Sequence, residues 1–461
     1  MLNMDYIVDL TSPFIWVFFL GSALQIIWNS WLSWRERDFV LKTEDEACTK
    51  LQELHSLAKD TFTEEKLKRS LSYERTSNAF SLFHGKCNRI IQGGILLFGL
   101  IPWLFSILLS SVGLPFVVSA ICISVALNWL DDIIDIPFDW HSTFTLEERF
   151  GFNTTTKKVF WTDFFKNQLV SAIFTAGSIA LSYFCLYGIH KFYGRVDWKV
   201  AIAFAVLNVI FGMLIEIVYM KIIMPLFNKV EPMKDCELKT KMETLLKSFG
   251  FSPKGVFVID ESKRSRHMNA YCTGWGKNKR LVLFDTLLKH FTDDELLAIL
   301  GHELAHAKLG HLVWNRILEV VQTSVFLIAA SFFIYSTPML AAFGYRGDAV
   351  PVQDGSIAAM TTVAFIALML FRKVFSSVDW ITDGVGSWIS RKMEFAADKH
   401  SCKYTEKAEP MITALFKLYG ENLSYPISDK IFEMWHFSHP SLVNRVEALK
   451  RVADEAGDKS K

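Results

Sequence analysis

The run VAIAFAVLNVIFGMLIEIVYMKIIM, residues 200–224, is apolar along almost its whole length. Glu216 and Lys221 are its only charged residues. A membrane-spanning helix needs about 20 predominantly apolar residues, because lipid offers no partners for backbone N–H and C=O groups. We therefore predict that this stretch crosses a membrane as a helix.

Six further apolar stretches lie on either side of this one. They cover residues 11–32, 90–109, 114–136, 169–189, 317–335 and 357–371. Charged residues make up 21% of the chain, against about 25% in an ordinary globular protein, and they are concentrated between the stretches. The sequence thus predicts a mainly α-helical, polytopic membrane protein with about seven transmembrane helices in contact with lipid.

The distribution of Lys and Arg predicts how the chain is oriented, because cytosolic loops carry an excess of both. The segment before the first span has none, whereas the loop that follows it has many. The loop with Lys191, Arg195 and Lys199 is the exception to this alternation. The N-terminus is predicted to be lumenal and the C-terminus cytosolic. The glycosylation sequons at Asn153 and Asn422 would then face the cytosol and stay unmodified.

Net charge and cysteine content give no support for three features: a nucleic-acid partner, a disulfide framework and a cysteine-ligated zinc site. The formal net charge is +1, which gives no support for a nucleic-acid partner. The seven cysteines are scattered and contain no C-x-x-C pair. This pattern predicts neither a disulfide framework nor a cysteine-ligated zinc site.

Residues 227–312 differ in character from the spans around them. The runs GVFVID (255–260) and RLVLF (280–284) are typical of short buried strands. Asp293 and Asp294 then begin a helix, and acidic residues in a first turn suit the helix dipole. We predict a small α+β unit here. The chain would then consist of spans one to five (1–226), this unit (227–312), spans six and seven (313–376) and a C-terminal helical part that completes the site (377–461).

The predicted helix contains His302-Glu303-Leu304-Ala305-His306, an H-E-x-x-H pattern. Residues four apart share one face of a helix, so both imidazoles can reach one Zn²⁺. Glu303 can reach a water molecule at the metal without becoming a ligand, and can act as its general base. A chance match on a charged helix is the alternative, and the predicted strand before the motif argues against it.

A catalytic zinc site needs a third protein ligand. His311 lies five residues after His306, about 140° around a continuing helix, and is better interpreted as a polar residue near the helix end. Glu394 and Asp398 are four apart within a helix predicted over 378–400, and could supply a ligand and an acceptor for a ligand histidine. On the residues alone, a solvated surface pair explains these two carboxylates better.

Several longer motifs resemble one family. They are the pair H-E-L-A-H and K-L-G-H, the later E-F-A-A-D, and the stretches EERFGFN (147–153), SKRSRHMNAY (262–271), KNKRLVLFDTLL (277–288) and SHPSLVNRVEAL (438–449). All are similar to the type I CAAX prenyl endopeptidases, integral-membrane zinc metalloproteases of the gluzincin type that mature a-factor and prelamin A. The resemblance extends over nearly the whole chain.

The resemblance implies a role for each residue of the metal site. His302, His306 and Glu394 would bind one Zn²⁺ per chain, and Glu303 would be the general base. Asp398 would stand behind a ligand histidine.

The resemblance also implies three roles that the residues alone do not suggest. His439 would help to stabilise the oxyanion, and Arg445 would support that region or contact substrate. Asn269 would lie on the edge strand that holds the substrate backbone. Without the resemblance, they would be interpreted as a turn residue, a surface charge and a loop residue.

The family fold implied for this chain has seven long helices that enclose a large chamber, plus a small α+β gluzincin-like protease insertion. The implied activity removes the last three residues of prenylated C-a-a-X proteins at the endoplasmic reticulum and inner nuclear membranes. A quality-control protease that acts on misfolded or stalled membrane proteins is an alternative. A scaffold without turnover is a third reading, and the intact H-E-x-x-H motif argues against it.

Overall fold

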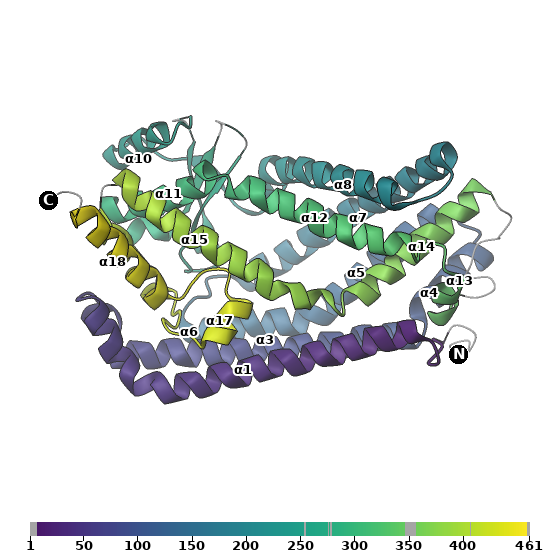
Figure 1. Ribbon diagram of the computed structural model, residues 1–461, viewed down its shortest axis with the longest axis horizontal. Coiled ribbons are helices and arrows are strands. Elements are labelled where there is room, and N and C mark those ends of the chain that lie inside the picture. The colour runs from purple at the N-terminus through teal and green to yellow at the C-terminus, as the bar shows by residue number, and fades with distance from the viewer. Residues whose placement is uncertain are drawn as a thin grey trace.

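The computed structural model describes residues 7–252, 255–274, 276, 279–345, 356–405 and 407–458. The molecule is elongated and mainly helical, with one small sheet towards one end (Figure 1). Its helices are α1 (Pro13–Leu54), α2 (Ala58–Thr61), α3 (Glu64–Leu97), α4 (Leu100–Ser106), α5 (Phe116–His141), α6 (Glu148–Phe150), α7 (Lys157–Tyr193), α8 (Trp198–Val218), α9 (Met224–Phe227), α10 (Glu237–Ser248), α11 (Asp293–Lys308), α12 (His311–Ser331), α13 (Thr337–Ala342), α14 (Ile357–Phe375), α15 (Asp383–Thr405), α16 (Glu409–Glu421), α17 (Lys430–His436) and α18 (Leu442–Asp458).

Up to seven helical stretches in the described part of the chain are long and apolar enough to cross a membrane. Six are continuous: Pro13–Leu54, Phe116–Phe150, Lys157–Tyr193, Trp198–Phe227, His311–Ser331 and Ile357–Phe375. The seventh is broken, because Glu64–Leu97 and Leu100–Leu109 meet at an angle of 45°. Gly99 lies at the break with a φ of 62°, which glycine adopts at little cost. The seven predicted spans are therefore found, with the second one bent rather than straight.

Two predicted helices are shifted along the chain. The sixth span was predicted over 317–335, but α12 begins at His311, directly after Gly310, which has a φ of 72°. The last long helix was predicted over 378–400, but a 3-10 turn (Asp379–Thr382) comes first and α15 continues to Thr405. The left-handed conformation of Gly310 fixes the start of α12.

The first helix, α1, is much longer than a bilayer is thick. Its 42 residues correspond to about 63 Å at 1.5 Å per residue, roughly twice the hydrocarbon thickness. The C-terminal half of α1 extends beyond that thickness, and there Leu51 shares a core with Phe416 of α16 and Val446 of α18. In this way α1 supports the C-terminal helices.

A four-stranded sheet forms the β part of the α+β unit. The strands are β1 (Val230–Pro232), β2 (Val256–Ile259), β3 (Ala270–Thr273) and β4 (Arg280–Phe284), in the order β1-β2-β4-β3. β2 and β4 are parallel, with Val256 opposite Leu281, and β3 is antiparallel to β4, with Ala270 opposite Leu283. The two strands predicted from apolar runs are β2 and β4. One long side of β3 has no partner strand among the described residues, so β3 is an edge strand.

Close packing of α15 against α11 positions the site. A Cβ atom added to Gly301 of α11 would come within 2.6 Å of Ser401 Oγ on α15, so only glycine allows this approach. Ser401 Oγ donates a hydrogen bond to the carbonyl of Ala298 at 2.9 Å. Ala397 of α15 is fully buried in the same core as Leu304 of α11. The two helices are therefore fixed in register one residue away from His302.

Candidate metal centre

The helix α11 carries the H-E-x-x-H motif and has a well-defined start. Thr292 and Glu295 form a capping box, in which each side chain accepts a hydrogen bond from the other residue's backbone N–H, and this satisfies two free donors of the first turn. One face of the helix carries His302, which is buried, and His306, which is half-buried. Their Nε2 atoms are 3.1 Å apart. Both imidazoles therefore point at the same place.

Glu394 of α15 completes a group of three potential donors. Its Oε2 lies 3.3 Å from His302 Nε2, and its Oε1 lies 3.2 Å from His306 Nε2. One ligand atom from each of the three residues lies within 4.8 Å of the other two. Glu394 Oε2 is buried and makes no hydrogen bond of good angular geometry among the described residues, although Nδ1 of His439 lies 2.8 Å away. Two imidazoles and one carboxylate, with a carboxylate oxygen left unsatisfied, fit the donor set of a catalytic zinc site.

Asp398 and Arg445 hold His302 in place from behind. His302 Nδ1 is 2.8 Å from Asp398 Oδ1. Arg445 donates from Nη2 to Asp398 Oδ1 at 2.7 Å and from Nε to Oδ2 at 2.9 Å. With its Nδ1–H given to Asp398, His302 keeps the lone pair of Nε2 directed at the three-donor site. All three residues are buried, so the orientation is fixed by the interior of the protein.

The charges at the site counteract the effect of burial on each carboxylate. Burial alone would raise the pKa of Glu394, but the imidazoles of His302, His306 and His439 hold it well below its usual range. Burial likewise opposes ionisation of Asp398, whose pKa is lowered by Arg445 and His302. Both carboxylates are therefore anionic at neutral pH, the form in which a carboxylate binds a cation or accepts a hydrogen bond from imidazole.

His439 lies beside this group, whereas the two other predicted residues, Glu303 and Asn269, are placed by their relation to the edge strand β3. The side chain of His439, in the loop before α18, is 62% exposed, and its Nδ1 is 2.8 Å from Glu394 Oε2. Glu303 is half-buried and lies near Cys272 of the edge strand. Burial raises the pKa of the Cys272 thiol to about 12, and the negative charge of Glu303 contributes to this rise. Asn269 is exposed and lies one residue before β3, where its carbonyl accepts from Phe284 N at 3.1 Å.

The contact between His311 and His306 was not predicted from the sequence. It is buried at the start of α12, and its Nδ1 lies 2.9 Å from Nδ1 of His306. The angle of about 140° expected for a continuing helix does not apply, because the chain turns at Gly310. Gly310 was the sequence signal that could have revealed this contact. His311 is thus the partner of the second ring nitrogen of His306, as Asp398 is for His302.

We expect that replacing His311 by alanine weakens metal binding about 10- to 100-fold, since outer partners of ligand histidines contribute that much. The measurement is competition for the metal with a chelator of known affinity. Replacement of the exposed His290 by alanine is the matched control and should have no effect. An unchanged affinity in His311→Ala would show that the contact with His306 does not orient it.

Comparison with known proteins decides the family. The model "Peptidase family M48" matches residues 232–453, and "CAAX prenyl protease N-terminal, five membrane helices" matches residues 45–229. The CAAX prenyl protease 1 homolog of Homo sapiens is 30% identical, over 92% of this chain and 93% of that protein. CAAX prenyl protease 1 of Saccharomyces cerevisiae is 31% identical over 94% of each. The chain belongs to the CAAX prenyl protease 1 family.

A solved structure of the same family has the same fold. The crystal structure of S. mikatae Ste24p matches with a TM-score of 0.79 and 29% identity, and the match covers 95% of this chain and 99% of that one. This member of the CAAX prenyl protease 1 family is therefore a multi-pass membrane protein and a metalloprotease of peptidase family M48.

Proposed function

We propose that this chain is a zinc endopeptidase that removes the three C-terminal residues of prenylated C-a-a-X proteins. The observation that carries the proposal is the convergence of His302, His306 and Glu394 on one point close to an open strand edge. Relatives that match over nine-tenths of the chain are named CAAX prenyl proteases, which supports the substrate class.

His302, His306 and Glu394 hold the zinc ion in this proposal, with Asp398 and His311 orienting the two imidazoles. When bound, zinc would act as a Lewis acid and would make a water molecule at the site more acidic. Glu303 takes the proton from that water and passes it to the leaving amine.

The protein's own groups also bind the substrate and its transition state. The unpaired edge of β3 holds the peptide backbone, which is added to the sheet as a further strand. Asn269 directly precedes the first residue of β3. His439, mostly exposed beside Glu394, donates to the oxyanion of the tetrahedral intermediate. Arg445 is buried against Asp398, so it acts by supporting this arrangement rather than by contact with the peptide.

The test of function is turnover of a farnesylated C-a-a-X peptide by the purified full chain, beside the same peptide without the farnesyl group. We expect release of the tripeptide from the farnesylated peptide at a clearly higher kcat/KM, with about one zinc per chain. Faster cleavage of unmodified chains would instead support a quality-control protease. A protein that binds zinc and cleaves neither would be a scaffold.

The proposed location is the endoplasmic reticulum membrane and the inner nuclear membrane, with a lumenal N-terminus and a cytosolic C-terminus. In this orientation Asn422 faces the cytosol, and its side chain is already engaged within the fold. Its Oδ1 accepts from Met268 N at 3.0 Å, and its Nδ2 donates to Met268 O at 3.2 Å. The four-part division at residues 226, 312 and 376 stays a prediction.

A further inference from the structure

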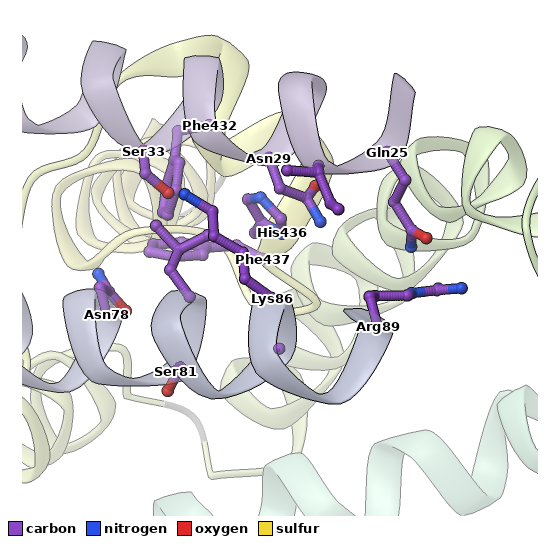
Figure 2. Close-up of a pocket in the computed structure, with 13 residues that line it drawn as sticks. Gln25, Asn29, Ser33, Asn78, Ser81, Lys86, Arg89, Phe432, His436 and Phe437 are labelled. Carbon is purple, nitrogen blue, oxygen red and sulfur yellow. The ribbon is translucent and has the colours of Figure 1, made fainter. Parts of the chain in front are cut away.

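A cavity of about 550 Å³, with both polar and apolar lining residues, lies between α1, α3 and α17. Its walls include Gln25, Asn29, Asn78, Lys86, Arg89 and His436. Figure 2 shows Gln25 and Asn29 on α1 facing Lys86 and Arg89 on α3, with the α17 residues behind them. No Asp or Glu is among the described residues that line it. This volume falls in the range of small-ligand sites.

The cavity faces the interior of the helix bundle rather than lipid. On α1, the outward face carries Ile27 and Trp34, which are 64% and 61% exposed. Gln25 and Asn29 are each two residues from Ile27, about 200° around the helix, and therefore lie on the opposite face. Polar side chains at membrane depth generally line such interior spaces.

A second cavity shares part of its lining with this space and reaches His439, whose Nδ1 lies beside Glu394 of the metal centre. It has a volume of about 330 Å³, and His439 is part of its wall. Asn78, His436 and Phe437 line both cavities. A peptide that extends from the metal centre past His439 therefore enters the smaller cavity first, and the larger one follows beyond Asn78.

The larger cavity contains positive charge without a counter-ion. The side chain of Lys86 is half-buried, and among the described residues its ammonium group has no hydrogen bond or ion pair. Within the same part of the chain, the side chain of Arg89 makes one hydrogen bond, from Nη2 to the carbonyl of Ser376 at 3.5 Å. The smaller cavity has one acid among its lining residues, Glu74, and burial raises the pKa of this carboxyl to about 8. A partly buried cation without a partner favours the binding of an anion.

We propose that Lys86 binds the C-terminal carboxylate of the peptide substrate, with Arg89 adding positive potential. This inference rests on the proposed function, because the three residues released from a C-a-a-X protein end in a free carboxylate. That carboxylate lies about 10 Å beyond the scissile bond in an extended chain. Long side chains on a helix lean towards its N-terminus, so Lys86 reaches back along α3 towards Asn78 and the smaller cavity.

The test measures binding separately from turnover, in full-length Glu303→Gln protein. Two farnesylated C-a-a-X peptides are compared, one with a free C-terminal carboxylate and one with a C-terminal amide. We expect the acid to bind about 10-fold or more tightly than the amide, as is typical of a charge-assisted hydrogen bond. Addition of Lys86→Met should remove this preference and leave the affinity for the amide unchanged, whereas Lys86→Arg should keep it.

Lys68→Met is the matched control, because Lys68 lies on the same helix but is exposed and paired with Glu64. It should keep the preference for the acid. Equal affinity for acid and amide, or a preference that survives Lys86→Met, would overturn the assignment of Lys86. Failure of the wild type to cleave either peptide, when the preference in binding is present, would contradict the proposed function and leave the carboxylate site in place.

Discussion

Replacing Glu303 by glutamine should lower kcat for the prenylated peptide about 100- to 10,000-fold while zinc stays bound. Glutamine has the size of glutamate but cannot take a proton, and general-base catalysis contributes this much. Zinc should be retained because the donors are His302, His306 and Glu394, whose ligand atoms lie within 4.8 Å of one another without Glu303. The measurements are single-turnover release of the tripeptide and metal content of the same sample.

The control for this variant is Asp294→Asn, an exposed carboxylate in the first turn of the same helix. It removes one negative charge from α11 far from the motif and should leave kcat within about twofold, since surface changes of this kind have small effects. If Glu303→Gln keeps more than a tenth of the wild-type rate, another group is the base. If it loses zinc as well, the variant does not isolate the proton transfer.

Replacing Arg445 by methionine should destabilise the protein by about 3–5 kcal/mol, because breaking a buried pair leaves an uncompensated charge. Asp398 is 1% exposed, and Arg445 supplies two of its hydrogen bonds. The measurement is denaturant unfolding of the metal-free protein in detergent, so that a change in zinc affinity does not enter the result.

Two further variants identify the cause of that loss. Asp398→Asn combined with Arg445→Met removes the charge that is left behind, and should be less destabilised than Arg445→Met alone. Arg451→Met, on the exposed face of α18, should change the free energy of unfolding by no more than about 0.5 kcal/mol. If the loss of unfolding free energy in the double variant equals the sum of the losses in Asp398→Asn and Arg445→Met, the two side chains do not act as a pair.

The spans could be predicted because each one carries its own signal. Lipid requires a long apolar helix, so a stretch such as 200–224 can be predicted as a span from its own residues alone. The break at Gly99 could not be found in this way, since the residues on both sides remain apolar. The strand β4 matched its apolar run at 280–284, whereas the four-residue β3 carries a weak pattern of its own and is held by its pairing with β4.

The residues of the metal site also differ in whether they could be predicted from nearby sequence or only from the packing of distant segments. His302, Glu303 and His306 follow from the helical period alone. Glu394 is 3% exposed and Arg445 6% exposed, although each looks like a surface residue in its own segment. Their burial comes from helices that are distant in sequence and packed together by the fold. Spacing alone made Glu394 a possible ligand but favoured a solvated surface residue, and the family resemblance was what assigned roles to both.

The order of the site residues along the chain has a consequence for biosynthesis. The first two donors, on α11, emerge from the ribosome before α12 and α14, and Glu394 on α15 only after both. Arg445 comes later still, on the last helix. Before α15 is made, the chain therefore has two imidazole donors without their carboxylate, so its metal site is incomplete. We expect full activity only after α18 has docked, because Arg445 holds Asp398 and, through it, His302.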